Sequence, residues 1–263
     1  MRASLFSQIA AAQRPRMRQN HRDIEFRAAL RPTDPQPAFV LHARPYRETS
    51  LLLELLTVHD GRVGAIARGV RGARGQPLRA ALQPLQPLMV SLRGRGELPL
   101  LAMAEARGVA SPLAGQGLLA AFYVNELLVR LLPRQDPQPT LFARYARLLD
   151  ELAAGSLGWT LRRFERDLLE ALGYGLVLDH EADSTAPIDP QGWYRYDRER
   201  GAVPTGPGPQ AVPGAALRAL ADEAEPAAAL LAPLRRLLRQ QLADHLGSRP
   251  LHSWSLLEGL AGG

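Results

Sequence analysis

The feature that most constrains the fold of this chain is a change of pattern near Gly108. Between Phe39 and Gly108 the apolar segments are short, are bounded by turn residues, and recur about every ten residues, which is typical of an all-β unit. After Gly108 the apolar residues recur at the three- and four-residue spacing of helices. The sequence therefore predicts an α+β multidomain chain, with a β unit first and a mostly α-helical unit second.

Five strands are predicted in the β unit, at about residues 38–43, 50–57, 62–68, 86–92 and 99–106. Asp60-Gly61 supplies the positive φ angles of a tight turn between the second strand and the third. Residues 51–56 are ambiguous, because Leu and Glu also favour a helix. A barrel of five strands with basic loops is the architecture of the OB-fold.

The second unit is predicted to begin with helices at 118–132 and 141–152 and a third helix with an apolar face, which is made of Leu157, Leu161, Phe164, Leu168 and Leu172. The charged residues off that face are expected to be solvated, namely Arg162, Arg163, Glu165, Arg166 and Glu170. A small hairpin is expected at 193–203. Pro233 suits the first turn of a later helix, and Ser253 is a candidate N-cap for a short final one.

The length of 263 residues favours two domains, since a single core rarely grows past about 250 residues. We expect a disordered basic arm and linker at 1–37, an OB-fold domain at 38–110 and a helical domain at 111–263. Met17 is a candidate alternative start. No apolar run reaches the roughly 18 residues of a membrane span, and residues 1–37 lack the pattern of a signal peptide. The expectation is a soluble protein.

Charge divides the chain at the same place as the change of pattern. Residues 1–110 hold 17 Arg and eight acidic residues, net +9, whereas residues 111–263 hold 15 Arg and 18 acidic residues, net −3. A basic first half favours binding of a polyanion, although a bias toward Arg also makes proteins basic. The chain has no Lys, which excludes a P-loop, and no Cys, which excludes disulfides and thiolate metal sites.

The strongest local motif is the Gly- and Arg-rich segment 68–75, which lies between two predicted strands. Arginine makes planar, bidentate contacts to phosphate, so a basic loop of this kind suits a nucleic-acid backbone. The alternative is a solvated loop. The candidate phosphate-binding residues in this segment and the loops that follow it are Arg68, Arg71, Arg74, Arg79, Arg93 and Arg95.

Two further groups of residues are weighed against plain structural roles. Asp179, His180, Glu181, Asp183 and Asp189 resemble an oxygen- and nitrogen-rich metal or hydrolase site, but they match no standard metalloenzyme spacing. Aromatic and Arg side chains on the helices at 118–132 and 141–152 suit a groove for an acidic peptide that ends in an aromatic residue and a carboxylate. Most of those apolar residues are equally suited to the core.

Several motifs follow one another in a specific order and spacing, namely Ala38–His42, Arg44–Leu51, Gly61–Val63, Ala67–Gly69, Leu82–Pro84, Gly94–Leu98, Ala104-Glu105, Tyr123–Leu127, Leu161–Glu165, Leu172–Gly175 and Pro250–Ser253. This order and spacing resemble those of the RecO family of bacterial recombination mediators. The resemblance implies an N-terminal OB-fold, in which residues 51–56 form a strand, and a helical C-terminal domain. It covers nearly all of the chain except residues 1–37 and about 180–230.

The resemblance also implies a cytoplasmic, nucleoid-associated bacterial protein whose function is non-enzymatic and needs no cofactor. Members of the family bind single- and double-stranded DNA, anneal complementary strands, bind the C-terminal tail of single-stranded-DNA-binding protein (SSB), and act with RecR to load RecA at gaps. Carried to this chain, the six arginines named above become DNA contacts, and Leu127, Arg130 and Arg144 become candidates for the SSB-tail groove.

One departure from the family pattern concerns zinc. Many relatives carry a four-cysteine zinc site after the Gly-Tyr-Gly segment, where this chain has Asp179-His180-Glu181. We therefore expect no zinc, and a hairpin around Trp193 that is held by packing alone. Two alternatives stay open: a protein-binding adaptor without direct DNA activity, and a metal-dependent nuclease that uses Asp179, His180 and Asp183.

Overall fold

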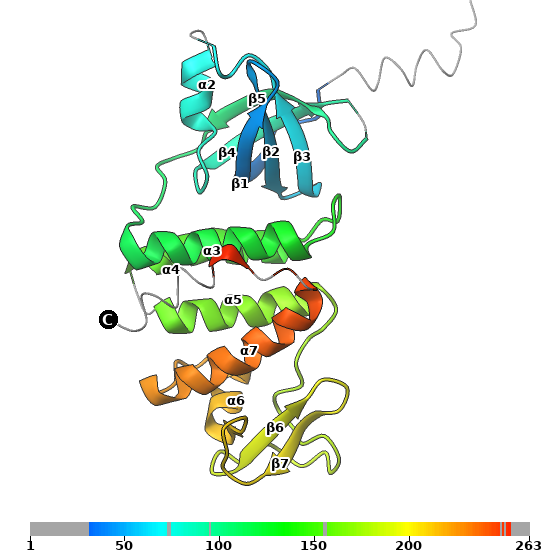
Figure 1. The fold of residues 1–263 in the computed structure, drawn as a ribbon, viewed down its shortest axis with the longest axis vertical. Helices are drawn as coiled ribbons and strands as arrows, with labels where there is room; N and C mark the ends of the chain where they lie inside the picture. The colour runs from blue at the N-terminus through cyan, green and yellow to red at the C-terminus, as the bar shows by residue number, and fades with distance from the viewer. Residues whose placement is uncertain are drawn as a thin grey trace, which may run out of the picture.

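The computed structural model describes residues 32–72, 75–94, 96–154, 157–247, 249 and 251–253. Its N-terminal part is a β-barrel, and its C-terminal part is a stack of helices that ends in a small sheet (Figure 1). Within these ranges, no helix has both the length and the apolar character needed to cross a membrane. Residues 1–31 of the arm predicted at 1–37 lie outside the described residues, as does the predicted final helix after Ser253.

The barrel confirms the predicted OB-fold. Its strands are β1 (Gln36–Tyr46), β2 (Ser50–Thr57), β3 (Gly61–Ala67), β4 (Pro87–Arg93) and β5 (Leu100–Ala106). They close in the order β1-β2-β3-β5-β4, and the β3–β5 pairing, Ile66 with Leu100, is parallel. Residues 51–56 form a strand because β2 is paired on both edges, with β1 and with β3, and its Leu53 and Leu55 fill the barrel interior.

Successive side chains of β1 point alternately into two different hydrophobic cores. Ala38 and Val40 face the barrel interior, whereas Phe39 and Leu41 point outward and join the core of the helical part. The Phe39 ring lies 5.0 Å from the Tyr145 ring, edge to face. The barrel and the helices therefore share one strand, and the barrel stands directly on the first helices (Figure 1).

Two expectations about the barrel ends need correction. The strand β1 starts at Gln36, inside the predicted disordered linker, because the Gln36 side chain is buried and accepts a hydrogen bond from the His59 amide at 2.9 Å. The turn after β2 takes three residues, 58–60, and its positive φ belongs to Gly61 (65°) and not to Asp60. Gly61 is also the residue on which a Cβ would overlap the Asp136 carbonyl, 2.0 Å away.

The short helix α2 (Gln76–Ala81) between β3 and β4 was not predicted. It begins with Pro77 in its first turn and follows a Gly-rich segment, so the sequence there is typical of a loop. None of its residues is fully buried. It lies at the end of the barrel far from the helical part (Figure 1).

The helical part is built from α3 (Gly115–Leu131), α4 (Pro139–Ala154), α5 (Leu157–Ala171) and α7 (Leu231–Leu246), with the short α6 (Gly214–Ala221) and the 3₁₀ turn η2 (Ala228–Leu230) before α7. The layer of α3 and α4 lies under the barrel, and α5 and α7 follow below it (Figure 1). The predicted helices at 118–132, 141–152 and 157–172 and the helix containing Pro233 are confirmed; α6 was not predicted.

The expectation that the charged residues of α5 are solvated is wrong for its centre. Arg162 and Glu165 are 4% and 0% exposed and form an ion pair. Burial raises the pKa of Glu165, and Arg162 and a hydrogen bond from the Tyr123 hydroxyl act against that rise. Because α5 packs between neighbouring helices, its polar side is covered as well, and the buried charges are tolerated because they are paired.

The small sheet confirms the predicted hairpin, with β6 (Trp193–Asp197), β7 (Gly201–Thr205) and β8 (Val212–Pro213) in the order β7-β6-β8. Packing alone does not hold it, contrary to expectation. The Tyr194 hydroxyl accepts a hydrogen bond from the Asp189 amide at 2.9 Å and donates to Glu181 at 3.1 Å. Arg200 and Asp183 add an ion pair.

Candidate nucleic-acid interface

Arginines gather at the end of the barrel away from the helices, where the β1–β2 turn meets the exit of β3. Strand pairing sets this arrangement, because Tyr46 pairs with Ser50 and Leu51 pairs with Ala67. Arg68, directly after β3, therefore lies beside the β1–β2 turn, and its side chain is exposed. We call Arg44, Arg47, Arg68 and Arg71 the barrel-end cluster.

Hydrogen bonds fix the loop after β3 to the β1–β2 turn. The Arg71 amide donates to the Thr49 carbonyl at 3.0 Å, and its guanidinium Nη1 donates to the Arg47 carbonyl at 3.2 Å. Val70, which directly precedes Arg71, is buried in the barrel core. The two basic segments are thus held together as one surface, with donors on Arg71 still available to a ligand.

Two members of the barrel-end cluster, Arg44 and Arg47, were not among the candidates predicted from sequence. Arg44 is exposed near the end of β1, and Arg47 sits in the turn with a φ of 54°, its guanidinium 5.3 Å from the centre of the Tyr46 ring. Tyr46 is half-buried and presents an aromatic face beside these cations. Their proximity to the Gly- and Arg-rich loop depends on strand register. The pairing of β1 with β2, and of β2 with β3, brings residues 44–47 next to that loop.

The remaining predicted DNA contacts are more dispersed. Arg79 lies on α2 and Arg93 at the end of β4, and both side chains are exposed. No hydrogen bond or ion pair among the described residues joins either one to the barrel-end cluster. Arg74 and Arg95 lie outside the described residues.

On the face of the barrel toward the helices, a different set of charged residues forms ion pairs at the junction. Glu54 on β2 pairs with Arg62 at 2.8 Å and also with Arg134, which follows α3. Arg62 Nε also donates to the Leu132 carbonyl at 2.9 Å. These two arginines are neutralised by Glu54 and used in the junction, whereas the arginines of the barrel-end cluster are exposed and able to meet an anion.

The predicted SSB-tail groove is not assembled from the three residues named for it. Leu127 is fully buried in the helical core. Arg130 Nη2 donates to the carbonyls of Leu246 and Arg249, at 2.9 and 2.8 Å. Arg144 forms ion pairs with Asp167 and Glu223. Leu127 is on the buried side of α3, so it cannot line a surface groove.

The acidic segment 179–189 forms a network of its own side chains. His180 Nδ1 lies 2.7 Å from Asp179, Glu181 accepts a hydrogen bond from the Ser184 hydroxyl at 2.6 Å, and Asp183 pairs with Arg200. Among the described residues, no cluster of His, Asp and Glu has the arrangement to hold a metal ion. The contacts of this segment are those of a loop that supports the β6–β7 hairpin.

Comparison with known proteins decides the family. A model described as "Recombination protein O N terminal" matches residues 35–110, and one described as "Recombination protein O C terminal" matches residues 114–255. The chain belongs to the RecO family. DNA repair protein RecO of Stenotrophomonas maltophilia strain K279a is 54% identical over 229 residues, which is 85% of this chain and 95% of the relative. DNA repair protein RecO of Xanthomonas oryzae pv. oryzae strain PXO99A is 51% identical over 230 residues, with the same coverage.

Membership of the RecO family supports a role in DNA repair and recombination, the process for which these relatives are named. The two matched regions correspond to the two parts of the structure. The N-terminal match contains the whole barrel, and the C-terminal match starts one residue before α3. The barrel-end cluster therefore belongs to the RecO N-terminal region and the acidic segment to the C-terminal one.

Proposed function

We propose that this chain is a recombination mediator that binds single- and double-stranded DNA through the barrel-end cluster and anneals complementary strands. It binds the C-terminal tail of SSB and acts with RecR to help load RecA onto SSB-coated gaps. It performs no covalent chemistry and needs no cofactor. The domains that carry these roles are the OB-fold at 38–110 and the helical domain at 111–263.

The observation that carries this proposal is the gathering of four arginines at the free end of an OB-fold barrel. Arg44, Arg47, Arg68 and Arg71 come from two segments that are hydrogen-bonded together, and Glu48 is the acidic residue in the same turn. An OB-fold commonly binds single strands with a positive surface and a few aromatic platforms, which here correspond to the arginines and Tyr46. Because the chain has no Lys, the cations of this cluster are all guanidinium groups, whose planar fork can contact a phosphate in a bidentate manner.

Annealing follows from charge neutralisation. Two DNA strands repel one another through their phosphates, and arginines that displace the condensed counterions lower this repulsion. The bases must remain free to pair, so contacts that go mainly to phosphate are suited to the task, and the low aromatic content of 6% agrees with that. No step in this mechanism requires a bond to form or break.

The proposal is tested by measuring the salt dependence of DNA binding. We expect a fluorescein-labelled single-stranded 20-mer to bind with an affinity that falls linearly on a log–log scale as salt rises. Replacing Arg68 and Arg71 by Gln should lower the slope by about 1.4, because each phosphate neutralised on a single strand contributes about 0.7. Arg62→Gln is not a suitable control, since Arg62 holds the junction with the helices.

The matched control is Arg147→Gln with Arg249→Gln, which removes the same charge from α4 and from the segment after α7; both residues are exposed, and neither side chain forms an ion pair with the described residues. An unchanged slope in the Arg68/Arg71 variant, with its circular dichroism spectrum intact, would rule out the barrel-end cluster as the phosphate site. If the wild-type protein fails to bind DNA at any salt concentration, a protein-binding adaptor is the better description. Strand cleavage on adding Mg²⁺ or Mn²⁺ would instead favour the nuclease alternative.

A further inference from the structure

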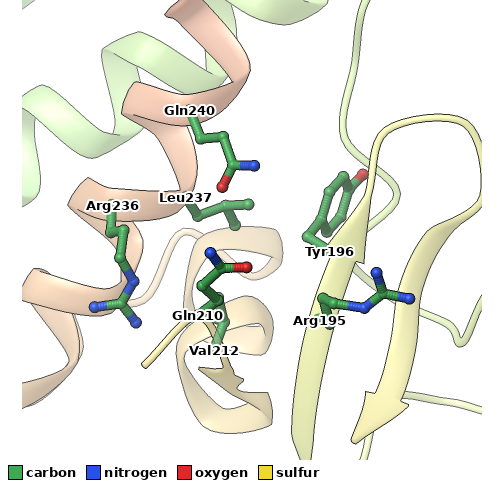
Figure 2. Close-up of a pocket in the computed structure, with 7 residues that line it drawn as sticks. All are labelled: Arg195, Tyr196, Gln210, Val212, Arg236, Leu237 and Gln240. Atoms are coloured by element: carbon green, nitrogen blue, oxygen red, sulfur yellow. The ribbon is translucent and has the colours of Figure 1, made fainter. Parts of the chain in front are cut away.

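A second basic surface lies at the opposite end of the molecule, in a hollow between the small sheet and α7. Seven side chains line it: Arg195, Tyr196, Gln210, Val212, Arg236, Leu237 and Gln240. We call it the α7 hollow. Figure 2 shows Leu237 between the amide groups of Gln240 and Gln210, with Arg236 on the α7 side and Arg195 on the sheet side, where its guanidinium extends outward over the hairpin.

The chemistry of the lining is that of an anion site. It contains two guanidinium groups and two amides, and no carboxylate is among the seven residues. This is unusual for its surroundings, because residues 111–263 carry a net charge of −3. Elsewhere in the helical part, arginines such as Arg144, Arg166 and Arg200 are paired with acidic residues.

Most of the polar groups in the hollow are available. Among the described residues, Arg195, Gln210 and Gln240 make no side-chain hydrogen bond or ion pair with the protein. Arg236 uses one Nη2 hydrogen bond, to the Ala211 carbonyl at 3.0 Å, which ties its guanidinium to the segment before β8. One cation is thus anchored, and the other donors face solvent.

The apolar residues give the hollow a firm floor. Leu237 and Val212 are buried, and the Tyr196 hydroxyl accepts a hydrogen bond from the Val177 amide at 2.8 Å, which fixes the ring. Burial raises the pKa of Tyr196 to about 12, so the phenol stays neutral and does not repel an anion. The floor belongs to the sheet and α7 together, which keeps Arg195 and Arg236 on either side of the same surface.

We propose that the α7 hollow binds the phosphodiester backbone of a nucleic-acid strand and gives the helical part its own DNA contact. Arg, Gln and Tyr are among the side chains that proteins use for phosphate contacts, and an open hollow admits a chain that passes through. Arg235, next to Arg236 on α7, is also exposed and extends the basic surface along the helix. The inference rests on the proposed function, to which it adds a second strand-binding site.

The first test repeats the salt titration with Arg195→Gln and Arg236→Gln combined, beside the barrel variant Arg68→Gln/Arg71→Gln and the control Arg147→Gln/Arg249→Gln. The hollow variant should lower the slope by about 1.4, as expected for two lost phosphate contacts. A slope equal to that of the control overturns the α7 hollow as a DNA site. The barrel variant reports on the proposed function separately, because it leaves the hollow unchanged.

The second test uses proximity. The chain has no cysteine, so Gln240→Cys and Ala153→Cys each create a single site for a benzophenone photo-crosslinker. Gln240 lies in the hollow, and Ala153 is exposed at the end of α4. We expect crosslinks to a 20-mer from position 240 that exceed those from position 153 and that disappear at high salt. Equal crosslinking from both positions contradicts the proposal.

A carboxylate ligand is the competing explanation of the same chemistry. An oligo-glutamate peptide is therefore added to the crosslinking reaction at the same charge concentration as the DNA. Persistence of the DNA crosslink at position 240 supports a phosphate site. Its loss to the peptide, together with crosslinks to the peptide itself, would assign the hollow to acidic protein segments and overturn the inference.

Discussion

Asn125 joins the barrel to the helices through two buried hydrogen bonds. Its Nδ2 donates to the Leu41 carbonyl on β1 at 3.0 Å, and its Oδ1 accepts from the Tyr145 hydroxyl on α4 at 2.6 Å. The side chain is 3% exposed, so neither partner has water as a substitute. One residue thus connects β1, α3 and α4, and the amide is needed because it both donates and accepts.

Replacing Asn125 by Ala should destabilise the protein strongly. The change leaves the Leu41 carbonyl and the Tyr145 hydroxyl buried without partners, each at a cost of about 1–3 kcal/mol, so we expect a loss of about 3 kcal/mol in the free energy of unfolding. Urea denaturation measures it. Tyr145→Phe is the companion variant, since it breaks one of the two bonds and should cost about 1–2 kcal/mol. Equal losses in the two variants would contradict this account.

Single residues also show where sequence reasoning reached the site and where it stopped. Arg68 and Arg71 were predicted because Gly-Arg repeats are visible in one segment. Arg44 and Arg47 were missed because their role depends on the register between β1 and β2, which a linear pattern does not reveal. Leu127 became a candidate for the groove through the family resemblance, because aromatic and Arg side chains lie near it in the sequence, yet its own position on α3 faces the core.

At the scale of elements, α3 and the C-terminal segment hold one another. Glu126 accepts hydrogen bonds from the amides of His252 and Ser253, at 2.8 and 2.9 Å, and from the Ser253 hydroxyl at 2.6 Å. One helical turn later, Arg130 binds the Leu246 carbonyl at the end of α7. Two of the motifs that resembled the family, Tyr123–Leu127 and Pro250–Ser253, are therefore partners in the fold.

Because these hydrogen bonds depend on the ionised Glu126 carboxylate, they make the C-terminal segment sensitive to acid. Burial alone raises the pKa of Glu126, but the hydrogen bonds from Ser253 and His252 outweigh it, so the pKa is lowered below 4.5. Stability from a lowered carboxylate pKa is complete above 4.5 and is lost as the pH falls through the folded value. We expect hydrogen exchange at residues 251–253, corrected for intrinsic rates, to stay constant above about pH 4.5 and to accelerate as the pH falls below it.

The control for the acid effect is Glu126→Gln, which keeps the size of the side chain but carries no charge at any pH. Its segment 251–253 should exchange faster than wild type at pH 6, and the difference between the two proteins should shrink as Glu126 becomes protonated. If the exchange of wild type and variant responds identically to pH, Glu126 does not control the segment.

Helices and strands with one buried, apolar face were easier to predict than the helix α5, in which the polar face is buried as well. The strands around the barrel and the helices α3 and α4 follow the apolar pattern, because apolar residues face one core or the other. On α5 the polar side is buried too, and the pairing of Arg162 with Glu165 that permits this depends on the tertiary packing. The short α2 carries no buried residue, so it left no apolar pattern to detect.

At the scale of the whole molecule, the barrel-end cluster and the α7 hollow lie at opposite ends of the stack, with the α3–α4 layer and α5 between them (Figure 1). The sequence predicted two parts and the basic character of the first one. It did not predict a basic surface on the second, because the residues of the hollow come from three separate segments within a part of net negative charge. Only the fold places Arg195 and Arg236 on the same surface.

Two separated DNA contacts on one molecule predict a characteristic dependence of annealing on protein concentration. One molecule that holds a strand at each end brings complementary strands together, and this effect is greatest when there is about one protein molecule per pair of strands. In excess protein each strand is bound by a different molecule, so annealing should slow down again. The measurement is energy transfer between two labelled complementary oligonucleotides across a protein titration.

The variants separate this bridging from simple charge neutralisation. Replacing Arg195 and Arg236 by Gln should abolish the maximum and leave a slower annealing rate that rises to a plateau, because neutralisation by the barrel-end cluster improves with every added molecule. If the annealing rate of the wild-type protein reaches a plateau and does not fall in excess protein, the two contacts never hold two strands at once. The two ends would then bind a single strand that runs along the helical stack.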